Sequence, residues 1–340
     1  MAKGMLTWIM LLFLLLAAGC GRSEKTVWDT PQPEYQKVRM AMAVTGTDRG
    51  INSRVAKRIA RLVAEESQGA VTIDVYTNDR LAGGNTVQGV EMLTDGSVDM
   101  AAYTSGTMSM LDPKLAVGTL PWAFRSYQEA RQVIDTTGGV YYEKLLKEQG
   151  IVYLGSTHNG MRQVSNNMRT IRRPEDLRGL RIRILGNENS FRFFQALGAE
   201  PVFTSWSDVP SAIRQGILNG HDSGLFTSNS SGMEELLGYM TNWNYSYENY
   251  LFMINSKTYN RLEPQTQKLL REKTREACEW GRDLLERSEE ELEEEFIGSG
   301  VEITNPSEEE LRVFRERTLP LVDELKKFYG KEACEAFQIQ

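Results

Sequence analysis

The feature that most constrains the fold is an alternation of strand-like and helix-like apolar patterns that begins at residue 38. Residues 38–44 and 71–75 place apolar side chains at every second position, which is the spacing of a half-buried strand. Between them, residues 51–63 place apolar side chains on one face of a helix. A further helix pattern surrounds residues 87–93, and residues 98–103 form a third strand pattern. This β-α-β-α-β order predicts a mostly parallel sheet covered by helices.

The alternation continues with a predicted helix at residues 127–148 and a predicted short strand at residues 151–154. A second unit then begins with a predicted strand at residues 181–185. We expect Ser207 to cap a following helix, because its hydroxyl can accept a backbone N–H at the helix start.

One long helix is predicted from Pro264 to about Phe296, because proline suits the first turn of a helix and glycines follow its end. About 33 residues at 1.5 Å each span about 50 Å, which is more than one domain needs. We therefore expect this helix to lie across two domains. Its acidic part, residues 286–295, is expected to be a solvated face, and a terminal helix is predicted at residues 307–329.

The amino terminus has the pattern of an export signal. Lys3 precedes an apolar run at residues 5–18, which is too short for a comfortable membrane span of about 20 residues. The run ends at Cys20 in a sequence that looks like a bacterial lipobox, so we expect residues 1–19 to be a signal peptide and Cys20 to carry lipid. The alternative is an ordinary signal peptide with an incidental cysteine. Residues 20–36 are predicted to be a tether.

Composition excludes several classes of function. The net charge of −7 argues against a nucleic-acid partner, which calls for a basic face. The chain has two His and three Cys with no zinc-module spacing, so no metal site and no cofactor is expected. No GxSxG and no paired carboxylates in a plausible setting occur, so we do not expect an enzyme. Whether Cys278 and Cys334 form a disulfide stays open.

Six short motifs resemble, in order, those of TRAP-transporter solute-binding proteins, and the resemblance covers about residues 38–335. It implies an α/β fold with two lobes, like a periplasmic binding protein, and a long helix spanning both. It also implies that the chain captures an organic acid and delivers it to a membrane permease driven by an ion gradient. The motifs lie at residues 95–99, 120–122, 173–183, 196–201, 207–209 and 212–216.

From this resemblance we expect lobe I to comprise residues 38–159 and 249–280, and lobe II residues 160–248 and 281–340. The protein would be extracytoplasmic, lipid-anchored and monomeric, and its partners would be a small carboxylate ligand and the membrane subunits of a TRAP transporter. The alternative is a ligand-sensing lipoprotein that reports to a membrane receptor.

Two arginines are candidates for holding the ligand carboxylate, because a guanidinium offers two parallel N–H donors. Arg183 lies between the apolar residues Ile182 and Ile184, and by resemblance it is the second-lobe arginine that pairs with the carboxylate. The alternative is a surface ion pair. Arg162 matches an arginine that lines the cleft in many members, and its alternative is a salt bridge that stabilises a lobe. Arg181 is expected to be peripheral.

The remaining candidates for ligand binding are Trp206, Ser223, Thr104 and Asp222. Trp206 is expected either to form an aromatic wall for the ligand or to pack in the core, and Ser223 replaces an Asn that often touches the ligand in the family. His221 is expected to be structural rather than a donor to the ligand. The ligand stays open among C4-dicarboxylates, sugar acids and keto acids, while residues 103–107 lack the Glu and Arg expected of a sialic-acid binder.

Overall fold

A single mixed sheet organises the chain, and the computed structural model describes residues 34–339. The main path of the sheet runs β2-β1-β3-β9-β4-β7-β5-β6, and the short strands β8 and β10 pair beside β4. The strands are β1 (Val38–Val44), β2 (Val71–Tyr76), β3 (Met100–Thr104), β4 (Ile151–Asn166), β5 (Arg181–Ile184), β6 (Glu200–Phe203), β7 (Gly220–Gly224), β8 (Tyr239–Thr241), β9 (Tyr247–Asn255) and β10 (Glu302–Thr304).

The sheet is mixed: its parallel pairings lie in two sections of the main path and between β8 and β10, and the other pairings are antiparallel. Strands β2, β1 and β3 are parallel and form the first section, and β7, β5 and β6 are parallel and form the second section. Strands β9 and β4 connect the sections, and each is antiparallel to its neighbours on the main path. The expected lobe boundaries at residues 159/160 and 248/249 fall inside these two connecting strands.

Strand β4 is 16 residues long, whereas apolar spacing predicted only residues 151–154. The missed part contains His158, Asn159, Arg162 and Gln163, all of which are buried. Buried polar side chains are tolerated when they find hydrogen-bond partners. The alternation rule cannot detect such a strand, because both of its faces are covered and both carry polar groups.

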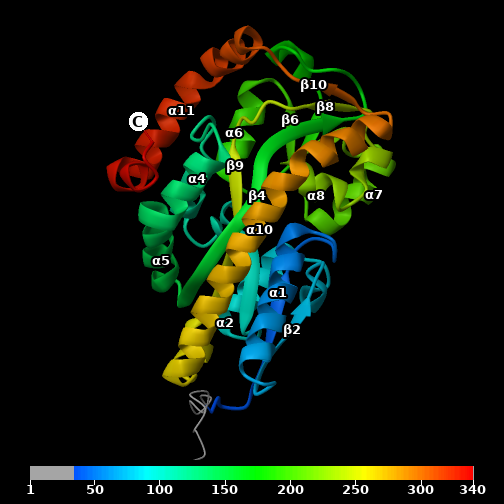
Figure 1. Cartoon of the computed structure of the whole chain (residues 1–340). Helices are drawn as coiled ribbons and strands as arrows, with labels where there is room; N and C mark the ends of the chain where they lie inside the picture. The colour runs from blue at the N-terminus through cyan, green and yellow to red at the C-terminus, as the bar shows by residue number, and fades with distance from the viewer. Residues whose placement is uncertain (1–33, 340) are drawn as a thin grey trace, which may run out of the picture. The chain divides into compact units, whose positions relative to one another are not determined.

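Helices cover both faces of the sheet (Figure 1). The predicted helix 127–148 is interrupted by a π-helical turn at Ile134–Gly138, and the terminal helix extends to Ala336 through a break at Gly330. The helices are α1 (Ile51–Glu66), α2 (Thr86–Asp95), α3 (Ser105–Met108), α4 (Tyr127–Val133), α5 (Gly139–Glu148), α6 (Glu188–Ala196), α7 (Val209–Arg214), α8 (Leu225–Asn229), α9 (Ser256–Asn260), α10 (Pro264–Gly298) and α11 (Glu308–Ala336).

Helix α10 has 35 residues and runs along β4 from α1 toward α8 and β10, so it follows both sheet sections as predicted (Figure 1). Its acidic stretch is not only a solvated face. Glu286 contacts the buried His158 and Arg131, and Glu289 accepts a hydrogen bond from the hydroxyl of Tyr127. These contacts connect the helix to β4 and α4.

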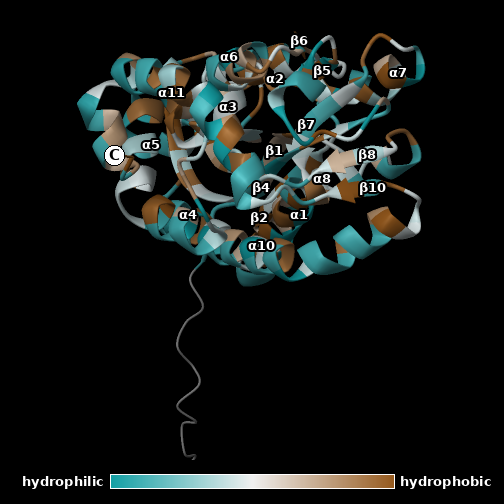
Figure 2. Cartoon of the chain, turned by 90° about the horizontal axis from the view of Figure 1, so that it is seen from above, coloured by the Kyte–Doolittle hydropathy of each residue, from teal (hydrophilic) through white to brown (hydrophobic). Residues whose placement is uncertain are grey.

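Alternate residues of the strands enter separate cores on the two faces of the sheet. Met40, Met42 and Val44 of β1 pack toward α1 and α10, whereas Ala43 belongs to the core on the other face. The alternation of apolar residues that predicted β1 therefore matches the alternation of its side chains between the two faces of the sheet. In Figure 2 the ribbon of α10 is mostly hydrophilic, as expected for a helix that buries only one stripe.

Ser207 does not cap a helix, contrary to the prediction. Residues 206–208 form a 3-10 turn, Asp208 occupies the position before α7, and the Ser207 hydroxyl donates to the carbonyl of Gly84 at 3.1 Å. Cys278 and Cys334 lie on α10 and α11 as free thiols. Within residues 34–339, no helix is both long and apolar enough to cross a membrane.

Candidate ligand-binding cleft

A cavity lies between the two sheet sections, at the carboxyl ends of their strands. Thr104 ends β3, Leu185 follows β5, Phe203 ends β6 and Ser223 lies near the end of β7. Loops beyond the carboxyl ends of parallel strands are where open α/β sheets bind ligands. The lining comprises Thr45, Gly46, Thr86, Thr104, Thr107 and Met110 on the first side, Arg183, Leu185, Gly186, Phe203, Ser205, Trp206, Ser223 and Thr227 on the second side, and Asn159, Arg162 and Tyr250 on the connecting strands or beside them.

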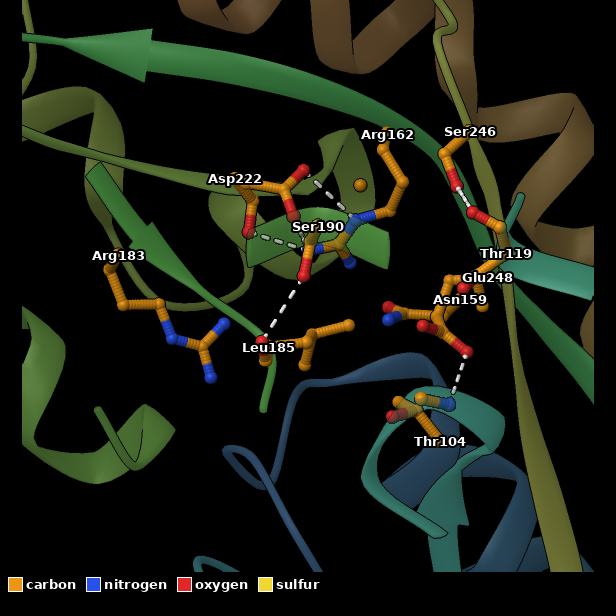
Figure 3. Close-up of polar contacts among 12 residues, drawn as sticks. Thr104, Thr119, Asn159, Arg162, Arg183, Leu185, Ser190, Asp222, Ser246 and Glu248 are labelled. Atoms are coloured by element: carbon orange, nitrogen blue, oxygen red, sulfur yellow. Dashed lines mark hydrogen bonds and ion pairs between the residues drawn. The ribbon is translucent and has the colours of Figure 1, made fainter. Parts of the chain in front are cut away.

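Arg183 is buried on β5, and its side chain has a single hydrogen-bond partner among residues 34–339. Its Nε donates to the carbonyl oxygen of Thr204 at 2.9 Å, and no carboxylate of the described chain pairs with it. Its guanidinium lies 5.1 Å from the ring centre of Trp206, in cation–π geometry. The structure therefore does not contain the surface ion pair that was the alternative interpretation of Arg183. The two terminal nitrogens face the cavity, without a dashed contact in Figure 3.

Burial changes the electrostatics of Arg183. Burial, followed by the nearby charge of Arg162, lowers the pKa of Arg183 to about 10, against the opposing charge of Asp222. The guanidinium still carries its charge at neutral pH. A buried charge without an anion is costly, so this site is built to receive one.

Arg162 lines the same cavity but already has an anionic partner. Its Nε donates to Oδ1 of Asp222 at 3.1 Å, and its Nη2 donates to Oδ2 at 2.8 Å and to the Asp222 carbonyl at 2.6 Å (Figure 3). Burial alone would lower the pKa of Arg162, but the charge and hydrogen bonds of Asp222 raise it well above its usual range. Arg162 thus both lines the cleft and forms the salt bridge that was its alternative interpretation.

Asp222 was a candidate for ligand contact, and the structure places it behind the cavity lining rather than in it. Its side chain is fully buried on β7 against Arg162. Removing one member of such a buried pair leaves the other charge uncompensated.

Trp206 forms part of the cavity wall, where it stacks with Arg183 and donates its Nε1–H to the hydroxyl of Ser231 at 3.0 Å. His221 packs edge-on against the same indole, with ring centres 5.5 Å apart. Neither ring nitrogen of His221 has a partner among the described residues. Burial and the charges of Arg183 and Arg162 lower the pKa of His221 to about 3, so this ring is neutral.

Thr104 and Ser223 both line the cavity, from opposite sides. The hydroxyl of Thr104 accepts the backbone N–H of Thr107 at 3.0 Å and thereby caps α3. Ser223 is buried in β7 opposite Gln163 of β4.

Sequence reasoning missed three residues at the connecting strands. Asn159 and Tyr250 line the cavity, and Glu248 lies buried beside it on β9 (Figure 3). Glu248 Oε1 accepts hydrogen bonds from the Ser105 hydroxyl at 2.6 Å and the Gly106 backbone at 3.1 Å. Burial raises the pKa of Glu248, against the opposing influence of Arg162 and these hydrogen bonds. The signal for Glu248 was an acidic residue within an otherwise apolar strand, and a search limited to motifs does not use this signal.

The two sides of the cleft touch at its rim. Besides the contact between Ser207 and Gly84, the hydroxyl of Thr47 donates to the carbonyl of Ser230 at 3.0 Å. The described residues contain no group of three or more His, Cys, Asp or Glu side chains arranged to hold a metal ion. The site is thus a cleft lined by apolar and polar side chains, with one cation that has no carboxylate partner among the described residues, which suits binding of an anion.

This fold and cleft define a class, the two-lobed extracytoplasmic binding proteins, and the comparisons identify the family. The model for bacterial extracellular solute-binding proteins, family 7 (DctP), matches residues 42–328. The chain belongs to this family of TRAP-transporter solute-binding proteins. It is a receptor for a solute and not an enzyme.

Two curated relatives illustrate the range of the family. The C4-dicarboxylate-binding protein DctB of Bacillus subtilis is 26% identical over 278 residues, covering 82% of this chain and 79% of the relative. The 2,3-diketo-L-gulonate-binding periplasmic protein YiaO of Escherichia coli is 23% identical over 248 residues, covering 73% of this chain and 75% of the relative.

Solved structures share the fold at lower identity. A TRAP periplasmic solute-binding protein from Ralstonia eutropha with bound (S)-2-acetolactate superposes with a TM-score of 0.85 at 23% identity, covering 88% of this chain and 98% of that one. The sugar acid binding protein DctPAm from Advenella mimigardefordensis, in complex with galactonate, gives 0.86 at 22% identity, with coverages of 90% and 98%. At these identities the likeness establishes the fold.

Proposed function

We propose that the protein captures a small organic acid outside the cytoplasm and delivers it to the membrane subunits of a TRAP transporter, with Arg183 holding the ligand carboxylate. The observation that carries this proposal is the buried Arg183, which lines the cavity and has no carboxylate at ion-pair distance among the described residues. A carboxylate accepts two parallel hydrogen bonds from a guanidinium, and the pair is stronger in a desolvated site.

The surroundings of Arg183 support this role. Trp206 and the Thr204 carbonyl hold the guanidinium in place, so little side-chain freedom is lost when a ligand binds. Asn159, Tyr250 and Ser223 add neutral polar groups around the same cavity. We further propose that the two sheet sections are the cores of two lobes, divided within β4 and β9, and that the protein acts as a monomer.

A thermal-shift screen with a library of organic acids tests the proposed function. A ligand that binds only the folded state stabilises it by about 2.7 kcal/mol at a hundredfold excess over Kd. We expect acids to raise the Tm, and the amides of the same acids to have no effect. If no acid in the library raises the Tm of the wild type, the proposed function is wrong.

We also propose that the mature protein is anchored by lipid on Cys20, which lies outside the described residues. The basis is the lipobox-like end of the apolar run at residues 5–18. Cells expressing the wild type should incorporate a palmitate analogue into the protein, and Cys20→Ser should abolish the labelling. Equal labelling of the two proteins would contradict the anchor.

A further inference from the structure

We propose that the cleft accepts one carboxylate only, so that its ligand is a short monocarboxylic acid with hydroxyl or oxo groups and not a C4-dicarboxylate. This inference rests on the proposed function and narrows it to a class of ligand. The argument comes from the charges that line and surround the cavity.

The second side and the connecting strands provide one uncompensated cation. Of the residues that the structure describes, Arg162 and Arg183 are the only charged ones in the cavity lining. Asp222 neutralises Arg162, whose guanidinium donates two hydrogen bonds to the Asp222 carboxylate and one to the Asp222 carbonyl. Arg183 therefore remains as the single cation that is available to a ligand.

The first side provides no charge at all. Its lining consists of Gly46, Met110 and four threonines, which are Thr45, Thr86, Thr104 and Thr107. Hydroxyl groups can donate hydrogen bonds to a carboxylate, but they do not compensate its charge. A dicarboxylate bound to Arg183 would direct its second carboxylate toward this neutral wall or toward the connecting strands.

The groups just behind the lining provide no further cation for a second carboxylate. Asp222 is already paired with Arg162, Glu248 is a buried acid whose pKa burial raises, and the buried His221 is neutral. A second ligand carboxylate would be desolvated near these groups without a cation of its own. Burying an ionised carboxylate without a partner carries a large penalty.

The neutral polar groups of the lining indicate what the rest of the ligand carries. Neutral polar groups of the first side and Asn159 would then contact hydroxyl or oxo groups on a short carbon chain.

Two matched pairs of acids test the proposal by isothermal titration calorimetry on the wild-type protein. 2-Hydroxybutanoate and malate share a four-carbon chain and a 2-hydroxyl, and they differ in a terminal methyl against a second carboxylate. Erythronate and tartrate provide a more hydroxylated pair of the same length. We expect the monocarboxylate of at least one pair to bind at least tenfold more tightly than its dicarboxylate.

Variants that add a cation should reverse this preference. Met110→Lys places an ammonium on the first side at a part-exposed position, and Met110→Gln is the neutral control of similar length. Asp222→Asn removes the carboxylate that pairs with Arg162, so it makes the charge of Arg162 available to a ligand without adding a new residue on the first side. We expect Met110→Lys to change the ratio of affinities about tenfold in favour of the dicarboxylate, and Met110→Gln to leave it unchanged.

The outcomes separate this inference from the proposed function. Tighter or equal binding of malate and tartrate to the wild type would overturn the single-carboxylate site, while organic-acid capture would stand. If none of the four acids binds, the ligand class proposed here is wrong, and the acid library described above decides on organic-acid capture itself.

Discussion

Arg183 carries the first prediction at the scale of single residues. Replacing it by alanine in the proposed site leaves the ligand carboxylate buried without its cation, which costs about 2–5 kcal/mol of binding. At 1.4 kcal/mol per tenfold, the affinity should fall roughly 30-fold to several-thousand-fold. Arg183→Lys should recover little of this, because an ammonium lacks the two-pronged geometry. Calorimetry with a ligand from the acid library measures the change.

Arg181 provides the matched control for Arg183. It lies two residues away on the same strand, outside the cavity lining, and its guanidinium contacts the Gly216 carbonyl at 2.7 Å and the side chain of Asn219 at 3.3 Å. Arg181→Ala should change the ligand affinity far less than Arg183→Ala. If Arg183→Ala binds as tightly as the wild type, the carboxylate site must be assigned elsewhere, first to Arg162.

Glu289 gives a prediction about the pH dependence of stability. Burial raises its pKa to about 7, helped by repulsion from Glu293 and Glu286 and opposed by the hydrogen bond from Tyr127. The folded state thus holds this proton more tightly than the unfolded state, where a glutamic acid titrates near pH 4.3. The resulting stability is fully present below about pH 4.3 and is lost as the pH rises through about 7.

Glu289→Gln keeps an acceptor for Tyr127 and removes the titration. As the pH rises from 5 to 8, the unfolding free energy of the wild type should fall by about 1–2 kcal/mol relative to this variant. This range is smaller than the full pKa shift would give, because the Glu289 side chain is partly exposed. Urea unfolding across this pH range measures the difference. Glu290→Gln, at the exposed neighbouring position on α10, controls for net charge. Parallel pH curves for the wild type and Glu289→Gln would contradict the prediction.

At the scale of elements, the close approach of α10 to its neighbours depends on Gly281. A Cβ added there would lie 2.3 Å from Cγ2 of Val55 on α1 and 2.8 Å from Oγ1 of Thr157 on β4. Gly281→Ala should therefore destabilise the fold by about 1–3 kcal/mol, as overpacking of a core does. Chemical denaturation is the measurement.

The same helix supplies the control for Gly281. Nothing lies within 4 Å of a Cβ added at Gly298, in the last turn of α10. Gly298→Ala should be neutral or stabilise the fold by up to about 1 kcal/mol, because alanine is the better helix former. Equal effects at the two positions would mean that the contact of α10 with α1 and β4 is looser than described here.

At the scale of the whole molecule, the contacts across the rim predict closure around the ligand. The continuous strands β4 and β9 and the helix α10 connect the two sides of the cleft, and α11 contacts both α6 and residues 113–119. Gly160 lies in β4 at a shift of the β4–β9 register, with φ of 118°, a conformation that only glycine adopts without strain. This bulge is a position at which the strand can bend.

Small-angle scattering tests this closure. Two bodies joined by a few flexing connections close around a ligand as a hinge. We expect the radius of gyration of the wild type to fall when a saturating acid is added. Arg183→Ala with the same acid serves as the control and should keep the radius of the ligand-free protein. A radius that does not change on ligand binding would indicate a rigid pocket.

Several features follow from the sequence alone, because they depend on neighbours along the chain. The alternation of strand and helix patterns predicted β1, β2 and β3, and Pro264 and the following glycines predicted the ends of α10. The motif around Arg183 identified the family and the candidate for the carboxylate site. Local periodicity and short motifs survive in the sequence because the residues that share a role are close together in it.

Tertiary structure decided what depends on residues that are distant in the sequence. The partner of Arg162 is Asp222, 60 positions away, and no local pattern predicts that this pair removes one of two cations from the cleft. Strand β4 is extended and polar because β9 and β7 pair with it and partners satisfy its buried side chains. Glu289 belongs to an acidic stretch that the sequence predicts to be solvated, yet Tyr127 covers it and donates a hydrogen bond to it. Burial and pairing set the charge of each of these groups, and both are properties of the folded chain.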